Sequence, residues 1–302
     1  MSSVSVIINC HNGERFLREA IDSIYRQTYT DWEIIFWDNS SNDKSASIAK
    51  SYDKKLKYFL ALKKTPLGEA RNLAMKQASG KYVAFLDCDD IYMPRKIEKQ
   101  IQLMEEYNYV MSYGSGLTIN EEGHEIKKIP VKNSSGYVFP ALLRHYEIGM
   151  QSVMILRSYL FQNKLEFDTK FSYCPDYNLF MIIACHKPVG IVKDFIVKDR
   201  VVKNSLQYSK ESINIAGTEV RLTLDTISNN YPDLLKKYSN GFKQAYGKSR
   251  FYDIVALIYL NDLKRARFKM KALIYLRYEF FILYLILFLP LSNKFLLKLI
   301  GR

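Results

Sequence analysis

The sequence predicts an α/β protein in which a mixed, Rossmann-type sheet carries helices on both faces and is followed by a C-terminal helical extension. Short apolar segments alternate with segments of helical periodicity in the first part of the chain. Several of these apolar segments have no polar side, which is typical of strands that helices cover on both faces. From residue 210 onward the pattern is mostly helical, so we place a boundary within residues 207–212.

The individual elements follow from hydrophobic periodicity and turn residues. The first four predicted strands lie at residues 4–8, 32–37, 56–62 and 82–86. Helices are predicted between them at residues 16–24, 45–51 and 69–77. Later strands are predicted at residues 117–119, 125–129, 152–156 and 195–202, and a later helix at residues 177–185. Ligands bind at the carboxyl ends of parallel strands, so the polar segments that follow the first, second and fourth strands should share one binding edge.

Composition narrows the class of protein. Hydrophobic residues make up 48% of the 302 residues, which favours a folded globular protein over a disordered one. The four cysteines form no C-x-x-C pair, which excludes a zinc ribbon or thioredoxin-like motif and fits a reducing compartment. The first predicted strand begins without a preceding basic segment, so we expect no secretory signal peptide and a cytoplasmic protein.

An acidic cluster follows the fourth strand. Its sequence, Asp87-Cys88-Asp89-Asp90, places three carboxylates within four residues, where they repel one another. A divalent cation would relieve this repulsion, and hard oxygen ligands suit Mg²⁺ or Mn²⁺, which can bridge a diphosphate. The alternative is that Asp89 or Asp90 caps the next helix or lies in a solvated turn.

Two residues upstream are further candidates. Asp38 follows the second strand, where its carboxylate could accept a hydrogen bond from the N–H of a uracil-like base. The alternative is an Asx turn in a loop rich in Ser and Asn. Arg71 lies near the start of a predicted helix, where it could reach a base or phosphate. A surface ion pair is the alternative for Arg71.

Four segments in order resemble the family 2 glycosyltransferases. They are SVIINCHNG at residues 5–13, WEIIFWDNSSND at 32–43, GEARN at 68–72 and GKYVAFLDCDD at 80–90. The resemblance is close over residues 3–93 and continues loosely to residue 206. It implies a GT-A fold and inverting, metal-dependent transfer of a hexose from a nucleotide diphosphate sugar. It also implies that Asp89 and Asp87 hold the Mg²⁺ or Mn²⁺ ion and that Asp38 contacts the base. We expect the nucleotide sugar to contact Asn9, His11, Gly68, Arg71, Asp87 and Cys88 as well, although Asn9 and His11 stand where Pro and Tyr are usual.

The resemblance further implies that Asp176 is the catalytic base. The chain departs from the family pattern here, because Pro175 stands where a Glu is usual. Without the resemblance, Asp176 could equally be a helix N-terminal carboxylate with no chemistry. In a later segment Val202 stands where a His near the metal is common, so we expect no third metal ligand from that loop.

The C-terminal segment is basic and apolar. Residues 262–302 contain nine basic and two acidic residues, a net charge of +7 within a chain total of +13. The apolar run at residues 280–291 is shorter than the roughly twenty residues that span a bilayer. Basic and apolar side chains together favour helices that lie on an anionic membrane surface. The alternative is a helical pair that packs on the domain or forms an oligomer.

These patterns lead to one expected function. We expect a GT-A catalytic domain at residues 1–208, with a nucleotide-sugar-binding half at 1–115 and an acceptor half at 116–208. The basic extension at 209–302 should attach the enzyme peripherally to the inner face of the cell membrane. The donor should be uridine-linked, and the acceptor should be a glycan or lipid-linked glycan of cell-surface polysaccharide biosynthesis.

Other functional classes are alternatives to this expected function. The alternative to an enzyme is an inactive nucleotide-sugar-binding or scaffold protein, in which the Pro175 replacement would reflect the loss of catalysis. A nucleotidyltransferase is less favoured because residues 9–13 do not form a Gly-rich loop. Nucleic acid is not expected as a partner, since no helix-turn-helix, RRM or zinc motif is visible.

Overall fold

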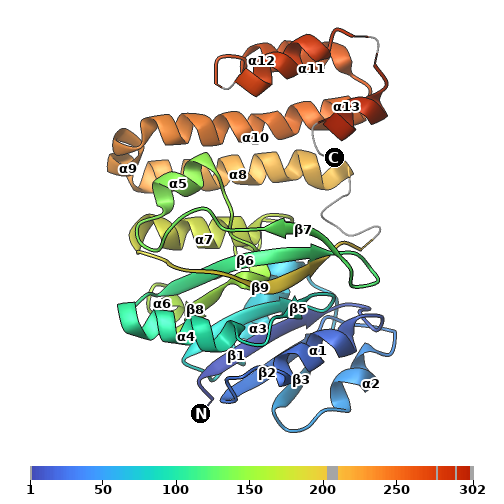
Figure 1. Ribbon diagram of the computed structural model, residues 1–302, viewed down its shortest axis with the longest axis vertical. Coiled ribbons are helices and arrows are strands. Elements are labelled where there is room, and N and C mark those ends of the chain that lie inside the picture. The colour runs from blue at the N-terminus through green and yellow to red at the C-terminus, as the bar shows by residue number, and fades with distance from the viewer. Residues whose placement is uncertain (1, 203–209, 277, 290, 300–302) are drawn as a thin grey trace. The chain divides into compact units, whose positions relative to one another are not determined.

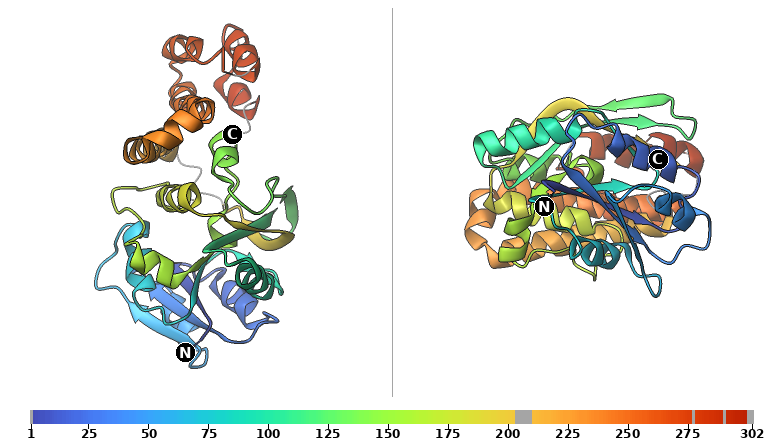
Figure 2. Two further views of the ribbon diagram at one scale, coloured as in Figure 1. Left: turned by 90° about the vertical axis from the view of Figure 1, so that its left-hand side faces the viewer. Right: turned by 90° about the horizontal axis from the view of Figure 1, so that it is seen from below.

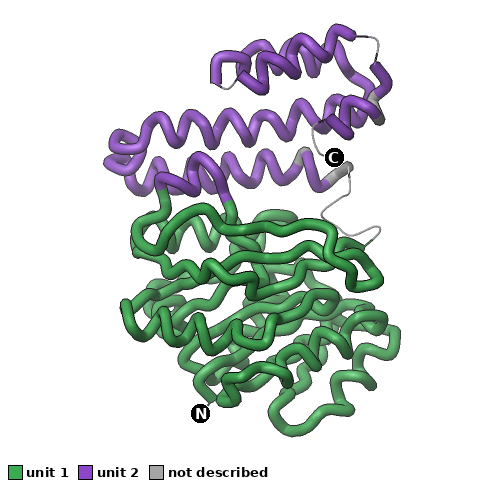
Figure 3. The backbone as a smooth tube through the Cα atoms, viewed as in Figure 1, with its two compact units in different colours: residues 1–139, 147–203 green, residues 140–146, 204–302 purple. Residues whose placement is uncertain are grey.

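A computed structural model describes residues 2–202, 210–276, 278–289 and 291–299. The chain divides into two compact units, which Figure 3 distinguishes by colour. The first unit comprises residues 1–139 and 147–203, and the second comprises residues 140–146 and 204–302. The boundary predicted after residue 208 lies outside the described residues. The division of the first unit into a donor half and an acceptor half stays a prediction.

One sheet forms the centre of the first unit (Figure 1). Its strands are β1 (Val4–Cys10), β2 (Trp32–Asp38), β3 (Leu56–Leu60), β4 (Tyr82–Asp87), β5 (Ile91–Tyr92), β6 (Met111–Ile119), β7 (Glu125–Ile129), β8 (Met154–Leu156) and β9 (Gly190–Arg200). They lie in the order β3-β2-β1-β4-β8-β6-β9-β5, with β7 paired to β6. Strands β1 to β4 run parallel, whereas β8 is antiparallel to β4 and to β6.

Helices connect the strands. Those of the first unit are α1 (Leu17–Tyr25), α2 (Ser45–Lys50), α3 (Leu67–Met75), α4 (Lys96–Tyr107), α6 (Arg157–Gln162) and α7 (Pro175–His186), with a 3-10 turn at Met150–Ser152. Helix α5 (Phe139–Arg144) falls almost wholly in the second unit. The other helices of the second unit are α8 (Lys210–Asn230), α9 (Pro232–Lys237), α10 (Ser239–Tyr259), α11 (Leu263–Lys271), α12 (Tyr278–Ile286) and α13 (Asn293–Leu299).

Helices cover both faces of the sheet, as the two views of Figure 2 make visible. On one face, β1 residues such as Ile8 pack against Ile21 of α1 and Ile97 of α4 in a single hydrophobic cluster. On the other face, the Phe85 ring meets the Phe167 ring edge to face at 5.5 Å, and Phe167 in turn packs on Phe180 of α7. The predicted α/β fold class with helices on both faces is confirmed.

The structure changes some predicted elements. The sequence pattern does not predict strand β5, since two residues are too short to give a period, and the strand forms only by pairing with β9. Strand β9 begins at Gly190 rather than at residue 195, because its first residues pair with β6 across a register shift. The strand expected from residue 152 begins at Met154, because Ser152 belongs to a 3-10 turn, in which its backbone N–H donates to Gly149 at 3.0 Å.

The second unit is helical, as predicted for residues after 210. Helices α8 and α10 lie side by side and are linked through α9 (Figure 1). One side of α11, α12 and α13 packs on α10 in a hydrophobic cluster that includes Ile254, Met270, Leu283 and Leu296. Of the helices that the structure describes, none combines the length and the apolar character needed to cross a membrane.

Candidate active site

Parallel register brings the predicted donor-binding residues to one edge of the sheet. Asn9 near the end of β1 is aligned with Asp87 at the end of β4 and with Trp37 in β2. Asn9 is buried, and its side-chain nitrogen Nδ2 has no hydrogen-bond partner. Because an unpaired buried donor is costly, this amide is well suited to bind a ligand at the edge.

Arg71 of α3 forms a buried ion pair at this edge. One guanidinium nitrogen, Nη2, lies 3.0 Å from Asp87 Oδ1, and the Arg71 side chain is only 5% exposed. The guanidinium also lies over the Phe167 ring, 5.6 Å from its centre. The predicted alternative of a surface ion pair is therefore wrong for Arg71, because packing against Phe167 removes the pair from water.

Helix α3 holds the segment that carries the predicted base. The side chain of Asn72 donates to the Phe167 carbonyl at 2.7 Å and accepts from the Phe167 N–H at 2.9 Å. A Cβ atom on Gly68 would lie 3.5 Å from the Pro175 side chain, so α3 packs closely against the start of α7. This packing brings Asp176, the second residue of α7, within electrostatic reach of Arg71 and Asp87.

The electrostatics of Asp176 reflect that position. Burial raises the pKa of the Asp176 carboxyl above its usual value, Arg71 opposes the rise, and Asp87 adds to it. A carboxylate whose pKa is raised is a stronger base, which suits removal of a proton from a hydroxyl. Asp87, Arg71 and Asp176, which are far apart in the sequence, therefore belong to one electrostatic group.

Asp38 is fully buried at the end of β2. Its Oδ1 accepts a hydrogen bond from the Ser41 N–H at 2.8 Å, which is the Asx-type turn considered as the alternative. Its Oδ2 accepts from the Tyr58 hydroxyl at 2.6 Å. A carboxylate has about four acceptor positions, so these two bonds fix the Asp38 side chain and leave acceptor capacity for a base.

The first loop is joined to the second by hydrogen bonds. His11 is exposed, and its Nδ1 lies 3.1 Å from the Asn39 carbonyl oxygen. Asn12, whose backbone is left-handed with φ of 57°, donates its N–H to Ser41 and accepts from the Asn42 N–H. These bonds give the edge a fixed shape and join His11 to the second loop.

The acidic cluster does not cap a helix. Helix α4 begins after Arg95 and has no side-chain cap, so the capping alternative for Asp89 and Asp90 is wrong. Asp90 is buried and accepts hydrogen bonds from the Gln151 side chain and from the Arg200 N–H at 2.6 Å. Asp89 is partly exposed, and burial together with the charge of Asp87 raises its pKa to about 6, while Arg200 opposes the rise.

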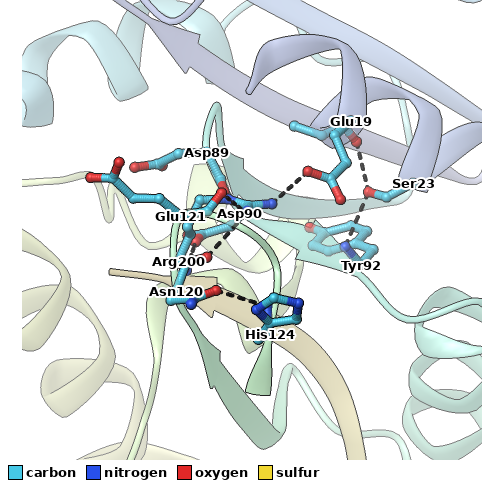
Figure 4. Close-up of polar contacts among 10 residues, drawn as sticks. Glu19, Ser23, Asp89, Asp90, Tyr92, Asn120, Glu121, His124 and Arg200 are labelled. Carbon is cyan, nitrogen blue, oxygen red and sulfur yellow. Dashed lines mark hydrogen bonds and ion pairs between the residues drawn. The ribbon is translucent and has the colours of Figure 1, made fainter. Parts of the chain in front are cut away.

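Arg200 holds the acidic cluster in place, and sequence reasoning did not single out this residue. Figure 4 shows it among Asp89, Asp90, Glu19 and the turn of the β6–β7 hairpin. Its side chain donates to the Asp89 carbonyl at 2.9 Å and to Glu19 of α1 at 2.5 Å. It also donates to the carbonyls of Asn120 and Glu121. Because Arg200 lies 110 residues after Asp90, no local sequence pattern indicates that the two residues meet.

Asp199 is a second residue that sequence reasoning missed. Its Oδ1 is buried without a hydrogen-bond partner. Burial and the charges of Asp87 and Asp89 raise the pKa of Asp199 to about 6. The cluster thus gathers the carboxylates of Asp87, Asp89, Asp90 and Asp199 around two guanidinium groups, those of Arg71 and Arg200. Carboxylate oxygens are the ligands that Mg²⁺ or Mn²⁺ prefers.

The described residues contain no group of three or more His, Cys, Asp or Glu side chains positioned to hold a metal ion by themselves. Mg²⁺ is commonly bound through one or two carboxylates together with substrate phosphates and waters. Two carboxylates, such as those of Asp89 and Asp87, are the number that such an ion takes from a protein when a diphosphate supplies the remaining oxygens.

Fold and site together define a glycosyltransferase of the GT-A class. A model of glycosyl transferase family 2 matches residues 5–170, which is more than half of the chain. The chain therefore belongs to glycosyl transferase family 2.

Relatives agree with this assignment. A glycosyltransferase of Rickettsia felis is 37% identical over 203 residues, which cover 66% of this chain and 33% of that protein. The chain thus matches about a third of the length of that relative. WfgD of Escherichia coli, a UDP-Glc:alpha-D-GlcNAc-diphosphoundecaprenol beta-1,3-glucosyltransferase, is 32% identical over 210 residues, with coverage of 68% of this chain and 80% of WfgD.

Solved structures share the fold. TarS of S. aureus in complex with UDP-GlcNAc has a TM-score of 0.61 at 17% identity, and the match covers 88% of each chain. The mannosyltransferase PcManGT of Pyrobaculum calidifontis, in complex with GDP-Man and Mn²⁺, has a TM-score of 0.63 at 17% identity. That match covers 90% of this chain and 74% of PcManGT. At this level of identity the likeness establishes the GT-A fold.

Proposed function

We propose that this glycosyltransferase moves a hexose from a nucleotide diphosphate sugar to an acceptor hydroxyl, with inversion at the anomeric carbon. The observation that carries the proposal is the group of Asp87, Arg71 and Asp176 at the carboxyl edge of the sheet. It brings together a candidate base and candidate nucleotide-binding residues. An in-line attack needs a base close to the donor site, because the acceptor hydroxyl must lose its proton as it approaches the anomeric carbon.

The donor is proposed to lie along the ends of β1, β2 and β4. Asp38 would accept from the base, and the unpaired Asn9 amide would donate to the nucleotide. Arg71 would keep Asp87 oriented through their ion pair, while Gly68, Cys88 and His11 would form the walls of the donor site. A uridine-linked donor is favoured because WfgD uses UDP-Glc and TarS was solved with UDP-GlcNAc.

Asp89 and Asp87 are the residues proposed to hold Mg²⁺ or Mn²⁺. When bound, such an ion would stabilise the negative charge of the departing diphosphate. The chain's own contribution is to keep Asp89 in position through Arg200 and to leave its carboxylate partly open. PcManGT, which has the same fold, was solved with Mn²⁺.

Asp176 is proposed to take the proton from the acceptor hydroxyl as that oxygen attacks the sugar. Its carboxylate lies at the start of α7, and Pro175 at the first helical position fixes the backbone there without losing a hydrogen bond. Pro175 also packs on Gly68, which ties the base to α3. The replacement of the usual Glu by Pro thus keeps Asp176 in place rather than removing the base.

The acceptor is proposed to be a lipid-linked glycan at the inner face of the cell membrane. The second unit presents apolar side chains outward next to basic ones. Phe268 of α11 is 81% exposed and lies between exposed Lys264 and Lys271 at helical spacing. Phe281 and Leu285 of α12 are also about half exposed. Such a surface fits the headgroup region of an anionic membrane.

The donor proposal is tested by thermal unfolding with UDP-glucose, UDP-N-acetylglucosamine and GDP-mannose, each with and without Mn²⁺. A donor at about 100 times its dissociation constant should add ~2.7 kcal/mol of stability, which raises the melting temperature by several degrees. The rise should depend on Mn²⁺ and be lost in Asp89→Asn. If no nucleotide sugar raises the melting temperature with Mn²⁺ present, the donor assignment is wrong.

An activity assay on the same purified protein distinguishes an enzyme from an inactive scaffold. Transfer to an undecaprenyl-diphosphate-linked sugar is followed by mass spectrometry of the extracted lipid. Donor binding without any transfer across a panel of lipid-linked acceptors would favour the scaffold.

A further inference from the structure

Two thiols meet at the carboxyl edge of the sheet. Cys10 is the last residue of β1, and Cys88 directly follows the last residue of β4. Because β1 and β4 are neighbouring parallel strands aligned through Asn9 and Asp87, the two cysteines are brought together although they are 78 positions apart. The function proposed above makes no use of this pairing.

The side chains converge on one point beside Gly13. A Cβ atom on Gly13 would lie 2.8 Å from the Cys10 sulfur and 2.8 Å from the Cys88 sulfur. Both sulfurs therefore lie next to one position, and the Cys10 thiol also donates to the Ser45 hydroxyl at 3.5 Å. Only glycine leaves room for both sulfurs here. Cys10 is buried at 2% exposure, whereas Cys88 is partly exposed, so a small oxidant can reach the pair from the Cys88 side.

The geometry points to a modification site: we propose that hydroperoxides convert Cys10 and Cys88 into a reversible disulfide that blocks the donor-binding edge. Neighbouring strands lie about 4.8 Å apart, within the ~4.4–6.8 Å between Cα atoms that a disulfide requires. Both sulfurs lie beside the same point next to Gly13, so only a short movement is needed to bring them into bonding distance.

The reaction is balanced with hydrogen peroxide as the oxidant. One thiol reacts with the peroxide to give a sulfenic acid and a first water. The second thiol then attacks the sulfenic sulfur, which forms the S–S bond and releases a second water. The two sulfurs lose two electrons and two protons in total, and the peroxide accepts them. A dithiol reductant reverses the change by thiol–disulfide exchange.

The disulfide would act on the site through the neighbours of each cysteine. Cys88 lies between Asp87 and Asp89, and Cys10 lies between Asn9 and His11. A covalent link would pull the acidic cluster toward the first loop and fix both. This consequence rests on the proposed function, whereas formation of the disulfide does not.

The disulfide is tested on the full chain. Reduced protein is treated with hydrogen peroxide, unreacted thiols are alkylated, and the intact mass and peptide map are measured. We expect loss of two hydrogens and a Cys10–Cys88 cross-linked peptide, both reversed by dithiothreitol. Cys10→Ser and Cys10→Ala should each abolish the cross-link, and Cys185→Ser, which alters a thiol in α7, should retain it. Absence of this cross-link, or a cross-link to Cys174 or Cys185 instead, overturns the proposal.

The effect on the site is measured separately. With Mn²⁺ and a UDP-sugar, the reduced protein should show a donor-induced rise in melting temperature, and the oxidised protein should lose at least half of it. Dithiothreitol should restore the full rise. An unchanged rise in cross-linked protein overturns the regulatory role. If the reduced protein shows no rise with any donor, the proposed function fails while the mass measurement still decides whether the thiols pair.

Discussion

Arg71 connects the two sides of the candidate site. Its guanidinium pairs with Asp87, lies over Phe167 and partly offsets the effect of burial on the pKa of Asp176. A buried charge that loses its partner is costly, so removal of Arg71 would disturb both carboxylates at once. One residue of α3 therefore links Asp87, a proposed metal ligand, to Asp176, the proposed base.

Replacement of Asp176 by Asn tests the base. General base catalysis contributes about 10²–10⁴-fold to rates, so kcat should fall at least a hundredfold while donor affinity changes little. Burial raises the pKa of Asp176 above the ordinary Asp value of about 3.9. Wild-type activity should therefore be lost on acidification at a pH higher than about 3.9, where Asp176 becomes protonated. Steady-state kinetics and donor titration measure these effects.

The matched control is Asp168→Asn. Asp168 lies in the same segment, and its carboxylate accepts only a local hydrogen bond from the Lys170 N–H among the contacts described. This variant should keep a normal kcat. Full activity in the Asp176→Asn enzyme would rule out the role of Asp176 as the base.

Arg200→Lys tests the support of the acidic cluster. A lysine cannot reproduce the fork of donors that reaches Glu19 and the Asp89 carbonyl. We expect a lower melting temperature and, well below that temperature, at least tenfold weaker Mn²⁺ binding in the presence of UDP, measured by calorimetry. Arg157→Lys is the control, because Arg157 donates to backbone carbonyls of Ser79 and Gly80 away from the cluster. Equal Mn²⁺ affinity in both variants would contradict a positioning role for Arg200.

At the scale of the elements, Glu33 ties three parallel strands together. It lies in β2, accepts from the Ser5 hydroxyl of β1 at 2.6 Å and pairs with Lys57 of β3. It also accepts from the Ser79 N–H and hydroxyl just before β4. Burial, the largest single effect, acts to raise the pKa of Glu33, but the hydrogen bonds from Lys57, Ser5 and Ser79 together lower it to about 2.

The pH dependence of Glu33→Gln follows from that lowered pKa. A carboxyl whose pKa falls from 4.5 to about 2 on folding stabilises the folded state above pH 4.5, by about 3 kcal/mol. This contribution is lost as the pH falls from 4.5 toward 2. Urea unfolding at pH 7 and pH 4 should therefore give a larger difference between wild type and variant at pH 7. Glu105→Gln, at an exposed ion pair with Lys81, should change stability by less than about 1 kcal/mol. A difference for Glu33→Gln that is as large at pH 4 would contradict this account.

At the scale of the whole molecule, the second unit carries both a core and an exposed apolar surface. Phe280, Leu283 and Leu287 face the cluster on α10, while Phe281 and Leu285 face outward. One side of α12 therefore packs on α10 within the second unit, and the alternatives of packing on the catalytic domain or forming an oligomer stay untested. The outward side is the part that a membrane would cover.

Cosedimentation with vesicles tests that surface. Wild type should bind phosphatidylglycerol-containing vesicles and release at high salt, because basic side chains contribute through screened electrostatics. Phe281→Ser and Leu285→Ser together should weaken binding at least tenfold, since each large side chain contributes roughly 1.5–3 kcal/mol on burial. Leu222→Ser, at an exposed position of α8, is the control. Equal binding of all three proteins would contradict the membrane proposal.

Sequence alone determined the fold class and the family, because the strands of the parallel half are locally encoded. Each has an apolar pattern and a polar break, and the breaks at Asn9, Asp38 and Asp87 fall on one edge wherever such strands pair in parallel. The short segments that carry these breaks are continuous in the chain, so their order and spacing suffice to indicate the family.

Tertiary structure decided which side chains meet across long sequence separations. The hydrophobic periodicity of the sequence does not predict that Arg200 supports Asp89, that Asp199 adds an unpaired carboxylate oxygen, or that Cys10 lies near Cys88 beside Gly13. These contacts depend on strand order and on helix packing, which bring together atoms whose residues have no local relation. Local strand propensity largely determines where the parallel strands lie in the sequence. The burial of side chains and the pairing of charges are determined only by the tertiary fold.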